Sequence, residues 1–189
     1  MYLINKMKKK ILFVAIVILV AFSPSLKAQS SATLSDNPAK VLLIIPMGIS
    51  KDLYDLNFGA VTLVTKTDGK MILSTDGSRE PSGGINTSAI KPIATNPTFS
   101  VTGSKNLGYT VTLPSFFTVS GKEVPTSTMK IDALTVKFNG FNEISAVGAT
   151  SVLDKDGNDS FKVGGTLNVT ADNGGGEYEG IFPVTVDYN

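Results

Sequence analysis

Short runs of β-branched and aromatic residues, separated by glycine-containing turns, limit the fold of this chain more than any other feature. Asp-Gly or Asn-Gly pairs occur at residues 68–69, 76–77, 139–140 and 156–157. Such pairs accept the positive φ angles that a tight turn needs. No stretch places apolar residues at the i, i+3, i+4 and i+7 spacing of an amphipathic helix over three turns. The pattern therefore predicts an all-β fold.

The expected strands are short and follow one another without long helical segments between them. They lie at residues 41–45, 61–65, 71–73, 99–102, 109–113, 117–119, 130–138, 161–163, 166–170 and 180–188. The clearest pair is 61–65 with 71–73, because the intervening Asp68 and Gly69 favour a hairpin. Strands at this spacing are typical of two packed layers, so we expect an immunoglobulin-like two-sheet β-sandwich.

The last of these strands predicts an exposed sheet edge. Alternation along residues 180–188 divides the side chains between two faces, with Phe182, Val184, Val186 and Tyr188 on one and Ile181, Pro183, Thr185 and Asp187 on the other. Pro183 has no N–H to give to a neighbouring strand, so the strand is expected to be an edge strand or to be interrupted there. At such an edge another strand can add.

The first 28 residues have the layout of a secretory signal peptide. Four lysines between residues 6 and 10 precede an apolar run at residues 11–22, and Ala28 offers a small residue for cleavage before Gln29. The run would reach about 18 Å as a helix, short of the roughly 30 Å hydrocarbon core, so no retained membrane anchor is expected. We expect export to the periplasm, the outer surface or the medium, a short segment at residues 29–39 and one domain at 40–189.

Composition excludes several classes of function. The chain has no histidine and no cysteine, which removes Ser-His and Cys-His nucleophiles, zinc-cysteine sites and disulfides. Five of the 17 basic residues and none of the 16 acidic ones precede residue 29, so the remaining chain has 12 basic and 16 acidic residues and a net charge of −4. Scattered charges with this balance give no footprint for nucleic acid.

Two patterns could in principle carry catalysis. Glu177 and Glu179 form a carboxylate pair of the kind that a glycosidase uses, although two charges on a solvated hairpin explain them as well. The Ser-x-x-Lys pattern occurs at residues 88–91 and 127–130, but that chemistry needs both side chains on one face of a helix. Pro92 disfavours a helix at Lys91, and Lys130 begins an expected strand. We therefore expect no catalytic residues.

An acidic segment is the nearest approach to a metal motif. Asp154, Asp156 and Asp159 would be the calcium ligands, but an EF-hand loop has glycine at its sixth position, whereas Gly157 is fourth here. A hairpin turn between the flanking strands explains the segment without an ion. The glycine clusters at 81–84 and 174–176 lack the downstream helix that a phosphate site needs. No metal or cofactor is expected.

The aromatic residues leave carbohydrate binding open as an alternative. Phe58, Phe99, Phe138, Phe161 and Phe182 fall on apolar faces and are expected in the core. Phe116, Phe117 and Phe141 could belong to the core, which we favour, or could present a platform for a sugar.

A family resemblance emerges from motifs in a fixed order. The segments are 55–59, 74–79, 99–103, 109–114, 164–169, 176–180 and 184–189. Together they resemble a family of secreted bacterial β-sandwich proteins catalogued as a domain of unknown function, similar in layout to spore-coat-U and Mat-type fimbrial subunits. The resemblance implies an exported immunoglobulin-like sandwich. By analogy, such subunits accept the N-terminal segment of a neighbour as a missing strand, yet residues 29–38 offer only Ala32 and Leu34 as apolar positions.

These observations combine into one expectation of function. We expect an exported, non-enzymatic structural or adhesin-like surface protein, with residues 182–188 as an edge for assembly. Its partner would be itself or a chaperone that binds by β-strand addition. The alternative is a glycan- or ligand-binding module built on Phe116 or Phe141.

Overall fold

The computed structural model describes residue 38 and residues 40–189. The predicted signal peptide at residues 1–28 and the segment at 29–37 lie outside the described residues. The described part contains 14 β-strands and no helix, which confirms the all-β class predicted from the sequence. No helix that could cross a membrane is present in the described part.

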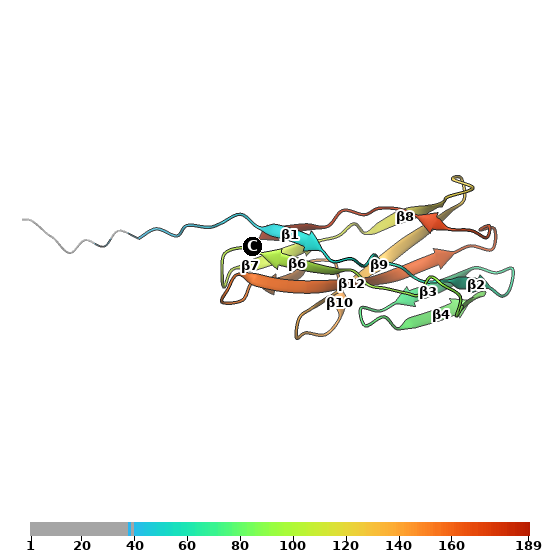
Figure 1. The fold of residues 1–189 in the computed structure, drawn as a ribbon, viewed down its shortest axis with the longest axis horizontal. Helices are drawn as coiled ribbons and strands as arrows, with labels where there is room; N and C mark the ends of the chain where they lie inside the picture. Colours follow the sequence, from blue (N-terminus) through green and yellow to red (C-terminus); the bar gives the residue numbers. More distant parts are fainter. Residues whose placement is uncertain (1–37, 39) are drawn as a thin grey trace, which may run out of the picture. The chain divides into compact units, whose positions relative to one another are not determined.

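The strands are short except for two in the centre (Figure 1). Their bounds are β1 Gly48–Lys51, β2 Val61–Leu63, β3 Gly69–Leu73, β4 Arg79–Gly83, β5 Ile85–Thr87, β6 Thr98–Thr102, β7 Gly108–Thr112, β8 Phe116–Gly121, β9 Thr128–Phe138, β10 Ile144–Ser145, β11 Ala149–Val152, β12 Asn158–Val169, β13 Tyr178–Glu179 and β14 Thr185–Tyr188.

A nine-stranded antiparallel sheet forms the larger layer. Six of its strands lie side by side in the order β1-β6-β12-β9-β8-β13, and β3, β4 and β10 pair outside this row. The long strands β12 and β9 lie in its middle. β12 pairs with β6 along its first half and with β3 along its second half, while β9 runs beside it for most of its length. β4 extends the sheet beyond β3, and β10 pairs with β9.

A β-bulge lies at the middle of the two long strands. The register passes from Gly164 opposite Thr135 to Thr166 opposite Asp132, so β9 carries one extra residue there. Ala133 takes up this extra residue with a positive φ of 45°. Because Gly164 and Gly165 remain inside the ladder, β12 is one strand of 12 residues. The prediction of two separate strands at 161–163 and 166–170 was therefore wrong.

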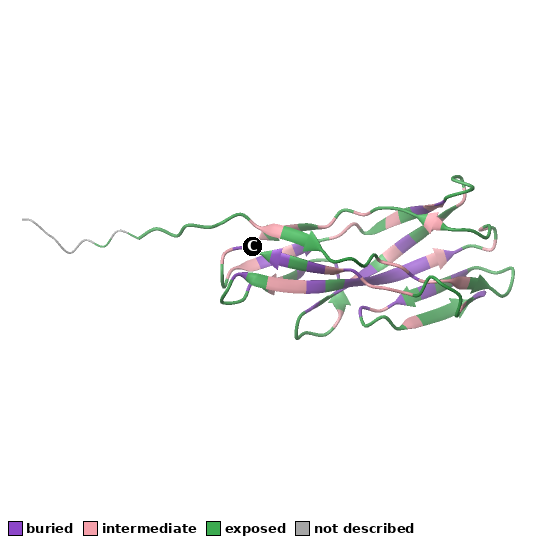
Figure 2. Cartoon of the chain, in the orientation of Figure 1, coloured by how far each residue is buried: buried purple, intermediate pink, exposed green. Residues whose placement is uncertain are grey.

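A three-stranded sheet, β11-β7-β14, forms the second layer of the sandwich. The Tyr109 ring on β7 meets the Phe138 ring on β9 edge-on, with 6.1 Å between the ring centroids. The Tyr109 hydroxyl donates to Asp159 at the start of β12 across 2.9 Å. Burial, together with this hydrogen bond to a carboxylate, raises the pKa of Tyr109. Buried side chains gather on β12, β9, β3 and β6 of the large sheet and on β7 of the small one (Figure 2).

The predicted hairpin of residues 61–65 with 71–73 does not form. β2 pairs with β5 in a separate two-stranded sheet, and β3 pairs with β4 and β12. The turn residue Asp68 is bonded elsewhere: its backbone oxygen accepts from Gly84 and its side chain accepts from Ala171. The chain therefore passes from the two-stranded sheet to the large sheet between β2 and β3. The local sequence does not indicate this change of sheet. The predicted turn at Asp76 and Gly77 does join a hairpin, that of β3 and β4.

Two further differences concern the ends of the domain. Residues 41–45 were predicted as a strand but form none, and the first strand is β1. Of the expected strand 180–188, residues 180–184 form no strand and residues 185–188 form β14, while β13 lies just before it at Tyr178–Glu179. β13 pairs with β8 of the large sheet whereas β14 pairs with β7 of the small one, so the chain changes layers near Pro183. The interruption predicted from this proline is confirmed.

Candidate functional site

The carboxylate pair predicted from the sequence is a surface ion pair. Glu177 and Glu179 both contact the ammonium group of Lys122, at 2.9 and 2.6 Å. The hydrogen bond from Lys122 lowers the pKa of Glu177, and the two glutamates raise the pKa of Lys122. Both carboxylates are largely exposed. The two carboxylates both face Lys122 and do not face each other across a cleft that could hold a sugar. They are therefore not arranged as the acid–base pair of a glycosidase.

The two Ser-x-x-Lys segments do not bring serine and lysine together. Ser88 follows β5 in a loop, and its hydroxyl accepts from the backbone N–H of Ile90. The Ser127 hydroxyl is bonded to that of Tyr178, while Lys130 pairs with Asp132 at 2.9 Å. Neither segment is helical, so the shared face that this chemistry requires is missing in both.

The three candidate calcium ligands have separate partners within the fold. One oxygen of Asp154 accepts two backbone N–H groups, those of Asn158 and Asp156, and these bonds lower its pKa. Asp156 pairs with Lys155, and Asp159 accepts from Tyr109 and from the Ser151 hydroxyl at 2.6 Å. Across the described residues no group of three or more carboxylates could hold a metal ion.

The acidic segment forms the predicted turn but not the predicted hairpin. The backbone N–H of Gly157 donates to the oxygen of Asp154, and Gly157 has a positive φ of 82°. The flanking strands β11 and β12 belong to different sheets. The turn therefore carries the chain from the small layer to the large one.

The three uncertain phenylalanines separate into two groups. Phe117 is half-buried and stacks on Phe182 with 4.8 Å between ring centroids, so it packs against the core as favoured. Phe116 and Phe141 are 53% and 66% exposed, which corrects the expectation that they belong to the core. They lie on different elements, β8 and the loop after β9, so they do not form one platform. Phe58, Phe99, Phe138 and Phe161 are buried as predicted, and Phe182 is half-buried.

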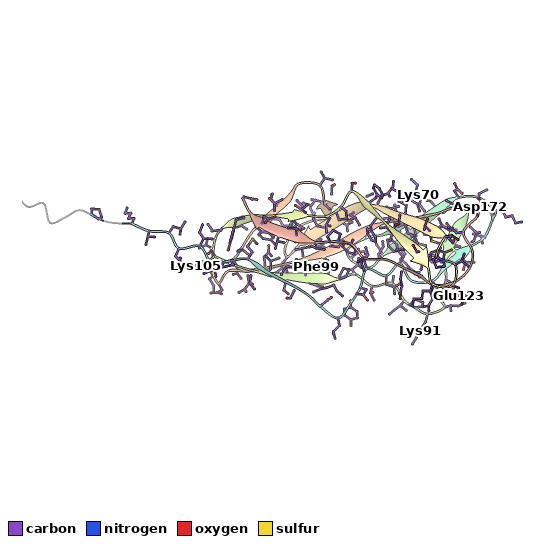
Figure 3. The ribbon with its side chains drawn as sticks, turned by 90° about the horizontal axis from the view of Figure 1, so that it is seen from above. Lys70, Lys91, Phe99, Lys105, Glu123 and Asp172 are labelled. Atoms are coloured by element: carbon purple, nitrogen blue, oxygen red, sulfur yellow. The ribbon has the colours of Figure 1, made fainter. Side chains whose placement is uncertain are left out.

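A shallow hollow lies beside the loops that follow β8 and β12. It is lined by Gly121, Glu123, Ser127, Asp172, Tyr178 and neighbouring loop residues. Glu123 and Asp172 lie at the same end of the molecule (Figure 3). The Tyr178 hydroxyl donates to the Gly174 oxygen at 2.7 Å and also bonds Ser127. The polar groups at the base of the hollow therefore already have partners.

The C-terminal strand β14 has backbone groups directed away from its sheet. β14 pairs with β7 alone. The Asn189 N–H donates to the Gly108 oxygen, and hydrogen-bonded pairs alternate along an antiparallel ladder. The pairs Asp187–Thr110 and Thr185–Thr112 therefore bond across to β7. The N–H and C=O groups of Val186 and Tyr188 point the other way, and we call this side the outer edge of β14.

An apolar row beside this outer edge is only partly covered. Phe182, Val184, Val186 and Tyr188 are all half-buried, while the residues between them are exposed. The last three pack against the core, and Phe182 stacks on Phe117. The predicted division of the two faces is therefore confirmed. Side chains of a complete sandwich at these positions would be buried, as Phe161 and Val163 are on β12. The row lacks cover along the outer edge.

An apolar segment of the same chain is exposed ahead of β1. Leu42, Leu43, Ile44 and Ile45 are 73%, 82%, 48% and 51% exposed. We call residues 42–45 the N-terminal apolar segment. Residues 41–45 were predicted as a strand, and the exposure of this apolar run shows that it does not pack into the sandwich.

Comparisons with known proteins place residues 47–188 in one family. Residues 47–188 match a family described as Domain of unknown function (DUF4402). The match spans β1 to β14 and begins two residues after the N-terminal apolar segment. A comparison with curated proteins finds no match. The resemblance to spore-coat-U and Mat-type fimbrial subunits stays a prediction.

Proposed function

The chain belongs to the family described as Domain of unknown function (DUF4402), and from that premise we propose that it is an exported, non-enzymatic structural protein of the cell envelope or surface. It assembles by β-strand addition at the outer edge of β14. The added strand is the N-terminal apolar segment of a second copy of the chain. The observation that carries this proposal is the partly covered apolar row beside the free backbone groups of Val186 and Tyr188.

The edge supports the proposal because it offers both kinds of interaction that an added strand uses. Backbone hydrogen bonds supply affinity in strand addition, and alternating side chains supply fit. The free N–H and C=O groups of Val186 and Tyr188 provide the first. The partly covered side chains of Val184 and Val186 provide the second, since every Å² of apolar surface removed from water contributes about 25 cal/mol.

The N-terminal apolar segment supports the proposal as the complementary partner. Leucine and isoleucine at four consecutive positions place two apolar side chains on each face of an extended strand. One face can pack on the row beside β14. The segment is uncharged and lacks proline, a combination that pairs readily with exposed edges. β14 is four residues long, so residues 42–44 are long enough to pair with most of it.

Export is part of the proposal and rests on the sequence. The layout of residues 1–28 is that of a signal peptide, and strand addition between copies then takes place outside the cytoplasm. A non-enzymatic role is supported by the absence of histidine and cysteine from the chain. It is also supported by the partners of Glu177 and Glu179, which are engaged by Lys122.

The experiment compares two proline variants of the chain that starts at residue 29. Val186→Pro removes an N–H on the outer edge, whereas Thr185→Pro removes an N–H that bonds to β7. We expect concentration-dependent assembly of the wild type by light scattering, its loss in Val186→Pro with the fold retained, and reduced stability of Thr185→Pro. A strictly monomeric wild type, even with a peptide of residues 40–47 added, would contradict the proposal. Binding only to a periplasmic chaperone would replace the second copy as partner.

A second candidate function is favoured by one observation on the opposite face of the large sheet. Phe116 is exposed there, with the Lys130 ammonium 5.1 Å from its ring centroid. Asp132 and Asn168, bonded to each other at 2.9 Å, lie on the adjacent strands. An aromatic ring beside polar groups on a flat sheet suits a glycan. Binding to a glycan array that is lost in Phe116→Ala and kept in Phe141→Ala would favour this function.

A further inference from the structure

The backbone of Ile45 is held by two side-chain hydroxyl groups from different parts of the fold. Its N–H donates to the Ser104 hydroxyl oxygen at 2.8 Å, and its C=O accepts from the Tyr188 hydroxyl at 2.8 Å. Ser104 and Tyr188 are themselves joined, because the Ser104 N–H donates to the Tyr188 oxygen at 2.6 Å. We call this three-residue arrangement the Ile45 clamp. Within residues 42–45 of the described chain, the hydrogen bonds involve Ile45 alone.

The position of the Tyr188 hydroxyl depends on a glycine. A Cβ atom on Gly103 would collide with this hydroxyl and would also lie 2.9 Å from Cδ1 of the buried Leu153. Gly103 has an ordinary backbone conformation, since it is absent from the residues with positive φ. Its lack of a side chain therefore makes room for the Tyr188 ring rather than for an unusual turn. The loop after β6 is thus shaped to receive the end of β14.

We infer that Ser104 and Tyr188 are positioning residues that hold Ile45 away from the outer edge of the molecule's own β14, so that the N-terminal apolar segment is offered to a second copy. This inference rests on the proposed function, because it names how one chain avoids filling its own edge. The clamp engages both backbone groups of Ile45. Because both groups are engaged, Ile45 itself does not bond to β14 of either copy, and Leu42, Leu43 and Ile44 are the residues left to pair.

The path of the chain agrees with this role. β1 runs antiparallel to β6, with Gly48 opposite Thr102. Ile45 continues the same direction and meets Ser104, two residues beyond the end of β6. Figure 1 shows residues 42–47 leading straight into β1. To cover its own β14 the segment would have to reverse at Pro46 and Met47, and the clamp fixes the extended direction through Ile45.

The test uses hydrogen exchange and light scattering on the chain that starts at residue 29. Tyr188→Phe removes only the hydroxyl, and Ser104→Ala removes the acceptor of the Ile45 N–H. Tyr178→Phe is the matched control, since the Tyr178 hydroxyl also makes two hydrogen bonds, to Ser127 and Gly174. In dilute, monomeric protein we expect the Ile45 amide to exchange roughly two- to tenfold faster in both clamp variants and unchanged in the control.

The protection of Leu43 and Ile44 and the assembled fraction test whether loss of the Ile45 hydrogen bonds changes the direction of the segment and the assembly of the protein. In Tyr188→Phe we expect the amides of Leu43 and Ile44 to gain protection as the segment folds back, and the assembled fraction to fall at least twofold. Unchanged exchange of Ile45 in Ser104→Ala would overturn the clamp. Faster exchange of Ile45 with assembly equal to the wild type would overturn its directing role. If the wild type does not assemble, the proposed function fails, and the protection of Leu43 and Ile44 in Tyr188→Phe still decides the inference.

Discussion

The strands β12 and β14 carry the same alternation of apolar side chains and differ in what surrounds them. β12 has a bonded neighbour on both sides along its length, and Phe161 and Val163 are almost completely buried. β14 has one neighbour, and Val186 and Tyr188 are half-buried. Because each pattern is equally apolar, the difference in burial comes from position in the sheet. Uncovered apolar surface on β14 is therefore available for a partner.

The largest effect is expected from truncating an aromatic residue of β12. Phe161→Ala removes a ring stacked on Phe99, with centroids 5.2 Å apart, and in edge contact with Phe138. We expect the free energy of unfolding to fall by about 3–5 kcal/mol, measured by denaturant titration. Phe182→Ala, beside β14, is the control and should lose about half as much. Equal losses would mean that the two regions are equally covered.

A matched pair of valines sharpens the same comparison. Val163→Ala on β12 should lower the free energy of unfolding by about 2–3 kcal/mol, since the side chain is fully buried. Val186→Ala on β14 should lower it by about 1 kcal/mol in dilute protein. At concentrations where copies assemble, the second loss should grow toward the first. A Val186→Ala loss that is large and independent of concentration would argue against an uncovered row.

Acid is expected to lower the free energy of unfolding by protonating Glu143, which lies in the loop between β9 and β10. Its carboxylate accepts from the N–H and the hydroxyl of buried Thr75, at 2.8 and 2.6 Å. Burial alone would raise the pKa of Glu143, but these bonds outweigh it and hold the pKa below 4.5. The stabilisation is therefore complete above the unfolded pKa and is lost as pH falls through the lower folded value.

The corresponding measurement is the pH dependence of unfolding in Glu143→Gln. We expect a loss of about 1 kcal/mol at pH 7 that shrinks toward zero under acid conditions. Glu80→Gln on exposed β4 is the control and should leave the profile unchanged. A Glu143→Gln loss that stays constant from pH 7 to strong acid would show that the charge contributes nothing.

The smallest effect on stability is expected in the N-terminal apolar segment. Leu43→Ser changes a side chain that the monomer leaves exposed, so the free energy of unfolding should move by less than about 0.5 kcal/mol. Assembly measured by light scattering should nevertheless decrease. Lys66→Ser, on an exposed loop, is the control for both readouts. A marked destabilisation by Leu43→Ser would place this residue in the monomer's core.

Local patterns predicted the elements of this fold better than their pairing. The strands around 99–102, 109–113 and 130–138 were found because alternation and turn chemistry act over a few residues. The hairpin of 61–65 with 71–73 was wrong because Asp68 bonds to Gly84 and Ala171, which are distant in sequence. Pro183 correctly predicted an interruption, since a missing N–H has the same consequence in any sheet.

The sequence predicted some features of the candidate site and missed others. The alternation of Phe182 with Val184, Val186 and Tyr188 was predicted, and so was an edge. The exposure of residues 42–45 was not, because an apolar run reads as buried until the neighbouring strands are known. The same holds for the Ile45 clamp, in which Ser104 and Tyr188 are brought together across 84 residues.

Local residue patterns were enough to predict the all-β class, most of the turns, the alternating faces of residues 182–188 and the lack of histidine and cysteine chemistry. These are properties of one residue or of a few neighbours. The tertiary structure alone decided which strands pair, that β14 ends its sheet, and that residues 42–45 lie outside the core. The reason is that burial and hydrogen bonding in sheets depend on partners far along the chain, and local propensity does not specify those partners.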